Sequence, residues 1–309
     1  MRIGPHSARR RAAGAIAALL CLAAPLALGS GSAGASARLH PAAQASPGEA
    51  ERIAGYWSPT RMRTARPLDS PLGGGPQATA SFLPIPDSSV PPYVVNGRLF
   101  VKQGRGKGFC SATAIASASR RLVLTAAHCV NSGPRSRHGN SVWSRFVEFV
   151  PAFDQGVAPF GAFIARRNAV FAPRQWVSSG NPNFDIGAIL VAPNANGAPL
   201  TDVVGGVGIA VARGRRQEYE TFGYPGGVKR LQGCRSPYIG DDSLTYRIPG
   251  PPTVAIRCHW GPGASGGAWL IENGTLIGGL TSYGKRGDSV HTFGPYFSQR
   301  NVGRLIRGM

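Results

Sequence analysis

A histidine, an aspartate and a serine stand in distinctive local sequences, in that order along the chain. His128 follows an apolar run in the sequence TAAHC, Asp185 lies in FDIG, and Ser265 lies in the glycine-rich sequence GASGG. A serine hydroxyl is a weak nucleophile that needs a neighbouring base. A histidine can take and return its proton, and a buried carboxylate fixes the imidazole tautomer. These residue types therefore predict nucleophilic catalysis of an acyl transfer.

We assign Ser265 as the nucleophile, His128 as the general base and Asp185 as the carboxylate that orients the histidine. The backbone N–H groups of Gly263 and Ser265 are expected to form the oxyanion hole, because glycines beside the serine let these donors approach the developing negative charge. Each residue also has a structural alternative: a packed core histidine, an aspartate in a turn, or a serine in a glycine-rich loop. The three motifs together favour catalysis over three separate structural roles.

The segments that would position these residues are short runs of apolar or alternating residues, separated by Gly, Pro and Asn. This pattern predicts an all-β fold. After the first 92 residues the chain keeps roughly 215, enough for two antiparallel six-stranded β-barrels. We expect barrel one over about 93–200, with His128 and Asp185, and barrel two over about 201–309, with Ser265. The site would lie in the crevice between them. The expected strands are 98–102, 109–116, 121–125, 145–153, 160–166, 186–191, 207–212, 219–223, 253–257, 268–271 and 276–281.

Outside this β pattern the chain has few other recognisable signals. A short C-terminal helix is expected over 299–307, where Val302, Leu305 and Ile306 share one face. The sequence has no GxxxxGK, HExxH or EF-hand pattern, so roles in nucleotide, zinc or EF-hand calcium binding lack support. We therefore expect no cofactor and no metal.

The first 37 residues have the features of a secretory signal. Four arginines within the first eleven residues precede an almost wholly apolar stretch over 12–28, and Ala35-Ser36-Ala37 matches a cleavage site. The apolar stretch is short for a membrane span, although a retained N-terminal anchor is the alternative. Cys21 lies inside this stretch without the small preceding residue that a lipoprotein signal needs, so we expect it to be discarded. We expect a secreted, extracellular protein without stable membrane insertion.

Residues 38–92 differ in composition from the rest of the chain. They are rich in Pro, Ala, Gly and Ser, and they show little periodic apolar pattern. We interpret them as a pro-segment or linker that is removed on maturation, because proteases could cut at arginines such as Arg63 and Arg66. The mature N-terminus is then expected between about Ser81 and Gly97.

Four cysteines remain after the signal, and in an exported chain they suggest two disulfides. Cys110 and Cys129 flank two expected strands and the histidine, so we pair them. Cys234 and Cys258 flank a loop and a strand before the nucleophile turn, so we pair them as well. A zinc site is the competing interpretation, but no C-x-x-C spacing occurs.

The chain is strongly basic, with a formal net charge of +20. Loss of the first 37 residues removes four arginines and no acidic residue, which leaves about +16. The basic residues are scattered, with small clusters at 135–138 and 213–216. Scattered charge argues against a nucleic-acid groove, and it is compatible with attraction to anionic cell-wall polymers or acidic substrates. An ordinary solvated surface is the alternative.

The three motifs give the chain a resemblance to a known family. The order His, Asp, Ser is that of the trypsin-like, chymotrypsin-fold serine peptidases, whereas subtilisins and α/β-hydrolases order these groups differently. The chain resembles these peptidases over roughly residues 94–309, and within them the secreted bacterial glutamyl-endopeptidase-like branch. The sequence GYWSPTRM, which begins at Gly55, is similar to pro-segments of secreted bacterial and fungal relatives. The resemblance implies a monomeric endopeptidase that acts on protein or peptide substrates.

The chain departs from the family at four positions around the nucleophile. Ala264 stands where most trypsin-like enzymes have the aspartate that pairs with a new N-terminus, so activation through that ion pair is not expected. Ala268 replaces the usual proline after the two glycines. Thr281 stands where glutamyl-specific enzymes have a histidine, and His259 stands where trypsin has an aspartate. Neither a strict Glu preference nor an Arg or Lys preference therefore follows.

The resemblance also implies where substrate binds. In this fold the substrate pairs as an added strand with the backbone after the nucleophile turn, here Ser282, Tyr283 and Gly284. The base of the first specificity pocket would lie near His259 and Thr281. Trp260 and His291 are further candidates for this pocket, and packing or loop roles are the alternatives for all four pocket positions.

Two other functions fit parts of the sequence. GASGG matches the G-x-S-x-G motif of esterases and lipases, but in that fold Asp and His follow the serine and long helices alternate with strands. A catalytically silent binding module on a protease scaffold is the other alternative, because fold alone does not dictate function. Such modules usually lose a triad residue, and this chain keeps all three.

Overall fold

A computed structural model describes residues 47–68, 82–83, 85–134 and 141–309. The predicted signal segment with Cys21 and the basic cluster at 135–138 lie outside the described residues, as do parts of the predicted pro-segment.

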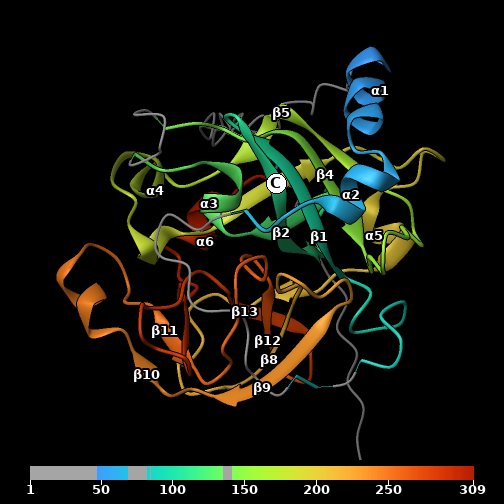
Figure 1. Ribbon diagram of the computed structural model, residues 1–309. Helices are drawn as coiled ribbons and strands as arrows, with labels where there is room; N and C mark the ends of the chain where they lie inside the picture. Colours follow the sequence, from blue (N-terminus) through green and yellow to red (C-terminus); the bar gives the residue numbers. More distant parts are fainter. Residues whose placement is uncertain (1–46, 69–81, 84, 135–140) are drawn as a thin grey trace, which may run out of the picture. The chain divides into compact units, whose positions relative to one another are not determined.

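The first half of the folded region is a closed, antiparallel six-stranded barrel, drawn in the upper part of Figure 1. Its interior is filled by alternating apolar side chains such as Leu99, Val123, Phe149 and Ile189, which are fully buried. The spatial order of the strands is β1 (Asn96–Gln103), β2 (Gly106–Ile115), β3 (Leu122–Thr125), β6 (Gly187–Val191), β5 (Phe163–Phe171) and β4 (Arg145–Pro151). The predicted first barrel is thus confirmed.

The second half is also built of β-strands, but it forms two sheets instead of one closed six-stranded barrel. The hydrogen bonding between strands does not continue around a closed barrel, because two of the strands are only two residues long. Loops that contain Gly and Pro separate the other strands. Three of the strands, at 232–237, 240–241 and 292–294, are not among those expected from the sequence. The five-stranded sheet has the order β7 (Gly208–Ile209), β13 (Leu276–Leu280), β12 (Ala268–Ile271), β8 (Glu218–Gly223) and β9 (Gln232–Pro237). The three-stranded sheet has the order β10 (Gly240–Asp241), β11 (Val254–Ile256) and β14 (Thr292–Gly294).

Short helices connect the strands. The C-terminal helix α6 (Val302–Leu305) is present but shorter than the predicted span 299–307. It begins late because the side chain of Asn301 accepts hydrogen bonds from the N–H groups of Ser298 and Val302, which fixes Asn301 as the N-cap. The other short helices are α3 (Ala127–Val130), α4 (Arg174–Ser179), α5 (Leu200–Val204), η1 (Pro182–Phe184) and η2 (Ser243–Arg247).

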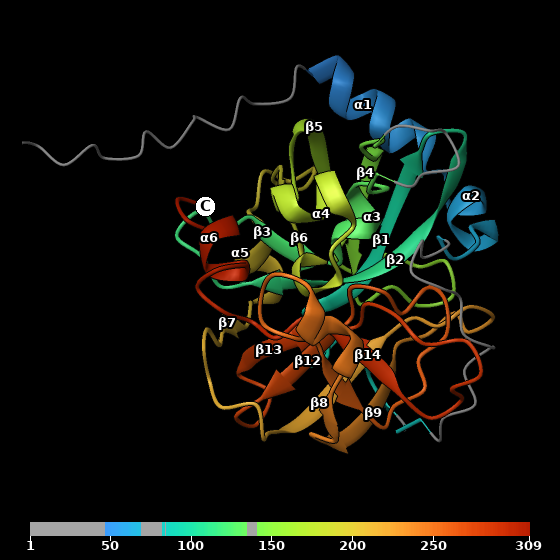
Figure 2. The ribbon, with the colours of Figure 1, turned by 90° about the vertical axis from the view of Figure 1, so that its left-hand side faces the viewer.

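Two helices lie in the predicted pro-segment, where the sequence indicated little regular structure. They are α1 (Pro47–Tyr56) and α2 (Pro59–Thr64), and Ser58 caps α2 by accepting a hydrogen bond from the N–H of Arg61. One side of each helix is buried, through Ile53 and Met62. Both views (Figures 1 and 2) show α1 and α2 on the outside of the first barrel, where α1 lies against β4 and β5 and α2 is drawn beside β1.

Both predicted disulfides are present. Cys110 in β2 is bonded to Cys129 in α3, and Cys234 in β9 is bonded to Cys258 after β11. In the described part of the chain, no helix is both long and apolar enough to cross a membrane.

Candidate active site

His128 and Asp185 are brought together by the pairing of β3 with β6. Thr125 pairs with Gly187 at the end of this ladder, so the histidine just after β3 meets the aspartate just before β6. Gly187 is needed for this approach, because a Cβ at this position would come within 2.9 Å of the Ala126 carbonyl oxygen. Local strand registry therefore assembles this pair within the first barrel.

The carboxylate of Asp185 is fully buried and accepts three hydrogen bonds. Its Oδ1 accepts from the backbone N–H of His128 at 2.8 Å, and its Oδ2 is 2.8 Å from Nδ1 of the same histidine. The third donor is the hydroxyl of Ser282, which comes from the second half of the fold. A carboxylate on Nδ1 holds the neutral imidazole in the tautomer whose Nε2 can accept a proton.

The second ring nitrogen of His128, Nε2, is in a different position from Nδ1. Its Nε2 is buried, and no atom of the described residues makes a hydrogen bond to it. Trp176 is fully buried near the imidazole, with the two ring centroids 6.2 Å apart. A buried imidazole nitrogen that no protein group satisfies suits a general base that meets its partner only in the reacting complex.

Ser265 lies in a tight turn with two glycines in the left-handed region of backbone space. Gly263 has φ of +97° and Gly266 has φ of +83°. A Cβ on Gly266 would stand 2.1 Å from the Thr125 hydroxyl, so the turn is packed directly against the end of β3. This contact places the turn of the second half beside the strand that leads to His128.

Ser111 in β2 joins the nucleophile turn to the first barrel, and sequence reasoning did not identify it. Its N–H donates to the carbonyl of Ser265 at 2.8 Å, and its hydroxyl donates to the carbonyl of Gly263 at 2.9 Å. The same hydroxyl accepts from the N–H of Tyr224. Its position next to Cys110 was the only signal in the sequence, and nothing there distinguished it from any other strand serine.

The backbone donors of the predicted oxyanion hole make no hydrogen bond to the described residues. Ser111 and Thr281 bind other groups of the turn, but among the described residues no acceptor takes the N–H of Gly263 or of Ser265. Two backbone donors on a turn of this kind can stabilise a negative oxygen on a carbonyl carbon attacked by the serine.

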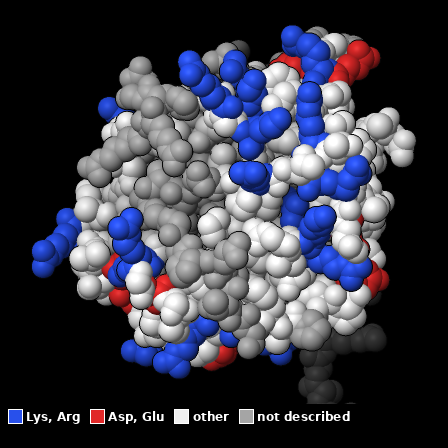
Figure 3. Space-filling view, in the orientation of Figure 1, with Lys and Arg blue, Asp and Glu red and all other residues white. Residues whose placement is uncertain are grey.

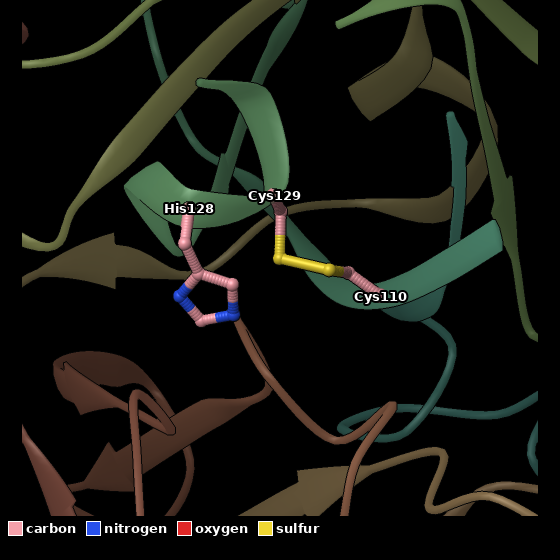
Figure 4. A group of neighbouring side chains, drawn as sticks. All are labelled: Cys110, His128 and Cys129. Atoms are coloured by element: carbon pink, nitrogen blue, oxygen red, sulfur yellow. A yellow bond between two sulfur atoms is a disulfide. The ribbon is translucent and has the colours of Figure 1, made fainter. Parts of the chain in front are cut away.

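The disulfide Cys110–Cys129 lies beside His128. Figure 4 shows the bond joining β2 and α3, with the imidazole of His128 on the same side. The two sulfur atoms and a ring nitrogen lie within 4.8 Å of one another, which is a spacing also found around metals. Because both sulfurs are bonded to each other, neither is a thiolate that could ligate a metal, and the disulfide acts here as a brace between β2 and α3.

The predicted substrate strand has backbone groups available for pairing. The N–H groups of Ser282 and Tyr283 donate to the carbonyl of Phe293, and the N–H of Phe293 donates back to Tyr283. In contrast, the carbonyl of Ser282 and both backbone groups of Gly284 make no hydrogen bond within the part of the chain that the structure describes. An added peptide strand could pair with these three groups.

The side chains predicted for the specificity pocket are mostly engaged elsewhere. The hydroxyl of Thr281 accepts from the indole N–H of the buried Trp269, and the indole N–H of Trp260 donates to Thr221. His259 is almost fully buried, with 3 % of its surface exposed. His291 is paired with Asp288, 3.0 Å from Nδ1 to Oδ2.

A polar network around Asp242 holds Tyr283 of the predicted substrate strand. Asp242 accepts from the hydroxyl of Tyr283 at 2.6 Å and from the ammonium of Lys285 at 2.8 Å. Burial alone would raise the pKa of the Asp242 carboxyl, but hydrogen bonds from Lys285, Tyr283 and the N–H of Leu244 hold it below its ordinary value. Asp242 therefore stays ionised and fixes Tyr283, whose ring also stacks on Phe293.

Positive charge is spread over the surface. Figure 3 shows many lysine and arginine side chains and few acidic ones on the upper and right parts of this face, where Figure 1 draws α1, α2 and the strands of the first barrel. Arg61 and Arg63 of α2 contribute to the exposed basic residues of this side.

Comparison with known proteins gives matches in structure. No family model and no curated protein sequence matches the chain. The protease Anisep from Arthrobacter nicotinovorans is 31% identical, with a TM-score of 0.60, over 68% of this chain and 93% of that one. A thermostable serine protease, AL20, from an extremophilic microorganism is 28% identical, with a TM-score of 0.59, over 67% and 92% of the two chains. A Glu endopeptidase is 18% identical, with a TM-score of 0.57, over 72% and 93%.

Proposed function

Because the chain belongs to the serine proteases of the chymotrypsin fold, we propose that it hydrolyses peptide bonds through Ser265, His128 and Asp185. The observation that carries this proposal is the buried carboxylate of Asp185, which binds Nδ1 of His128 from the first barrel and the hydroxyl of Ser282 from the second half. A purely structural role for Asp185 would not explain why the other nitrogen of this histidine, Nε2, has no hydrogen-bond partner among the residues that the structure describes.

In the proposed reaction the Ser265 hydroxyl attacks the carbonyl carbon of the scissile bond and its proton passes to Nε2 of His128. The N–H groups of Gly263 and Ser265 stabilise the oxyanion, and Asp185 stabilises the imidazolium. Collapse of the intermediate breaks the C–N bond, and His128 gives its proton to the leaving amine. A water molecule then attacks the acyl-enzyme with His128 again as base, which releases the acid and restores the serine.

We further propose that the protein is made as a secreted precursor and acts as a monomer. The support is the N-terminal signal pattern together with two disulfides, which persist in oxidising compartments. Processing between about Ser81 and Gly97 fits the exposed turn at Asp87–Ser89, where the chain is accessible. The basic surface would attract acidic substrates or anionic cell-wall polymers, and no nucleic-acid partner is proposed.

For specificity we propose weak cleavage after Lys or Arg and a preference for uncharged or acidic residues. A lysine or arginine side chain would meet no carboxylate at His259 or Thr281, and an unpaired buried cation is costly. The carboxylate of Asp288 accepts hydrogen bonds from the N–H groups of Val290 and His291 and pairs with the His291 ring. These contacts already engage the carboxylate, so we do not assign it to a substrate cation. The likeness to a Glu endopeptidase is one of fold at 18% identity, so the glutamyl branch remains a proposal.

The proposal is tested with Ser265→Ala in the processed protein. The variant is expected to lose about a million-fold in kcat and to keep its fold, because the serine hydroxyl contributes little packing. Wild type should be labelled at Ser265 by an organofluorophosphonate, and the variant should not. Peptide hydrolysis that survives in Ser265→Ala contradicts the assignment. Labelling without peptide hydrolysis would favour an esterase, and absence of both would favour a silent binding module. Profiling with matched peptides that differ only at the residue before the cut tests the specificity.

A further inference from the structure

The described part of the predicted pro-segment is packed into the protease domain. Trp57, between α1 and α2, is 2% exposed, and its ring lies 5.3 Å from that of Phe100 in β1. Its indole N–H donates to the carbonyl of Phe146 at 2.5 Å, while Tyr56 stacks on the Phe146 ring at 4.5 Å. Met62 of α2 joins the same core. A buried tryptophan with a satisfied N–H is typical of an anchor in a recognition interface.

The backbone of the barrel is shaped to accept this anchor. Phe146 has φ of +50°, a left-handed conformation that is unfavourable for a bulky residue, and it lies at a bulge in the pairing of β1 with β4. This conformation turns its carbonyl to the Trp57 indole. The carbonyl of this strained residue binds Trp57 and its ring stacks on Tyr56. Because one segment makes both contacts, we infer that the segment is a bound partner of the barrel.

Beyond α2 the segment adds to the edge of β2. The N–H of Phe109 donates to the carbonyl of Arg66 at 3.0 Å, and the N–H of Leu68 donates to the carbonyl of Phe109 at 2.9 Å. Pro67 thereby forms a parallel bridge with Phe109. Main-chain pairing of this kind is how an extended peptide binds to a sheet edge.

Three glycines of the protease domain allow the segment to approach closely. A Cβ on Gly108 would lie 2.6 Å from the Arg66 carbonyl oxygen, and one on Gly156 would lie 2.5 Å from the side chain of Arg63. A Cβ on Gly226 would lie 2.8 Å from the Pro67 ring. Any larger residue at these positions would push the segment away, so the surface is complementary to it.

The strand at Phe109 lies next to the catalytic groups. The Phe109 ring is in contact with Gly263, since a Cβ there would stand 2.8 Å from it, and the next residue, Cys110, is bonded to the neighbour of His128. The acyl half of a substrate would run along the backbone of Ser282 and Gly284. The leaving half would then run past His128, along the side where Arg66–Leu68 already lies.

Resting on the proposed function, we propose that residues 47–68 are a built-in inhibitor that stays bound to the first barrel after the chain is cut. Trp57 anchors the inhibitor, and Arg66–Leu68 occupies the path of the substrate residues that follow the scissile bond. Cleavage after residue 83 therefore does not activate the enzyme by itself, and activity appears when the segment leaves. Nearer the cut, Phe82 stacks on Trp260 at 5.0 Å and the N–H of Leu83 donates to Gly233, which attaches these two residues to the second half.

The test uses the full chain with a site for an added, specific protease in the exposed turn at Asp87–Ser89. After the cut, the N-terminal fragment of wild type is expected to elute with the protease domain on a sizing column, and hydrolysis of a peptide that extends to both sides of the cut should stay low. Trp57→Ala should weaken fragment binding and raise that hydrolysis about 30-fold, the usual effect of truncating a buried tryptophan anchor. Glu51→Ala, an exposed position of α1, is the matched control and should behave as wild type.

Leu68→Pro provides a second test that leaves the Trp57 anchor in place. It removes the N–H that binds the Phe109 carbonyl and is expected to raise hydrolysis about fivefold. Elution of the wild-type fragment apart from the domain overturns the proposal, whatever the activity. So does a cut wild type that hydrolyses the peptide as fast as cut Trp57→Ala. Fluorophosphonate labelling of Ser265 in the same samples tests the proposed function separately. An enzyme that is labelled but not inhibited contradicts the inhibitor role of residues 47–68 and leaves the proposed peptidase function standing.

Discussion

The two halves of the fold hold their buried charges in opposite ways. In the first barrel Glu148 of β4 is buried and has no ionic partner among the described residues, and burial raises its pKa to about 8. In the second half the buried Asp242 binds Lys285 and Tyr283, and its pKa lies below its ordinary value despite its burial. The closed barrel therefore positions His128 and Asp185 through the registry of β3 with β6. In the second half, a polar network around Asp242 fixes Tyr283.

Arg98 shows how the first barrel accommodates a cation without a carboxylate. Its guanidinium stands 4.1 Å from the centroid of the Phe109 ring, 4.7 Å from that of Phe153 and 5.2 Å from that of Tyr224, and it donates to the carbonyl of Val228. Burial lowers its pKa to about 10. Three aromatic faces and one carbonyl thus stabilise the Arg98 cation, whereas in the second half Lys285 pairs with the carboxylate of Asp242.

Asp185 belongs to the first barrel but is bound from both halves, so its replacement has the largest expected effect. Asp185→Asn should lower kcat about 10,000-fold with little change in stability, because the amide cannot hold the imidazole in the required tautomer. Steady-state kinetics with thermal unfolding as the control checks this. If activity is nearly unchanged, then another group orients His128.

Glu148→Gln tests the unpaired charge of the first barrel. With its pKa raised from 4.5 to about 8, Glu148 keeps its proton in the folded state over a range where the unfolded chain releases it. The contribution of Glu148 to wild-type stability should therefore be greatest below about pH 4.5 and be lost as pH rises toward 8. Glutamine does not titrate, so the Glu148→Gln variant should not lose this stability as pH rises. At pH 9 its free energy of unfolding should exceed that of wild type by on the order of a few kcal/mol.

Urea unfolding of both proteins at pH 5 and pH 9 measures the difference. The gain from the substitution should be small at pH 5 and large at pH 9. Equal slopes of stability against pH in the two proteins would show that Glu148 is hydrated or paired in solution, and the contrast between the halves would then disappear.

Ser282→Ala removes the hydrogen bond that the second half of the fold makes to Asp185. Asp185 would keep both contacts with His128, so the loss should be much smaller than for Asp185→Asn, about tenfold in kcat. KM should change little, because only the side chain is removed from the substrate strand. A loss as large as that of Asp185→Asn would mean that the second half, and not the barrel, orients the histidine.

Tyr283→Phe is expected to have the smallest effect. It keeps the stacking on Phe293 but removes the hydroxyl that donates to Asp242, which typically costs about 1 kcal/mol of stability. Lys285 remains bound to Asp242, so the network is weakened and not lost. KM for peptides should rise a few-fold at unchanged kcat, and a fall in kcat alone would place the effect on chemistry instead of on substrate binding.

Local sequence was enough to predict the parts of the fold that depend on local pattern. The runs that became β1 to β6 carry a period that fits a pleated, half-buried strand, and the spacing of Cys110 and Cys129 around His128 predicted their disulfide. The weak points were short strands without a pattern of their own, such as β10, and the helix α1, whose apolar residues are few and surrounded by small and charged ones.

By itself, the sequence determined the family, the all-β class and the three residues proposed for catalysis, because motifs such as TAAHC are local and each residue type has a distinct chemistry. Only the tertiary structure decided that Ser111 holds the nucleophile turn, that Ser282 donates to Asp185, and that residues 47–68 are packed on the barrel. These contacts join residues far apart in the chain, and their hydrogen bonds and burial depend on how the two halves pack. No local pattern encodes that packing.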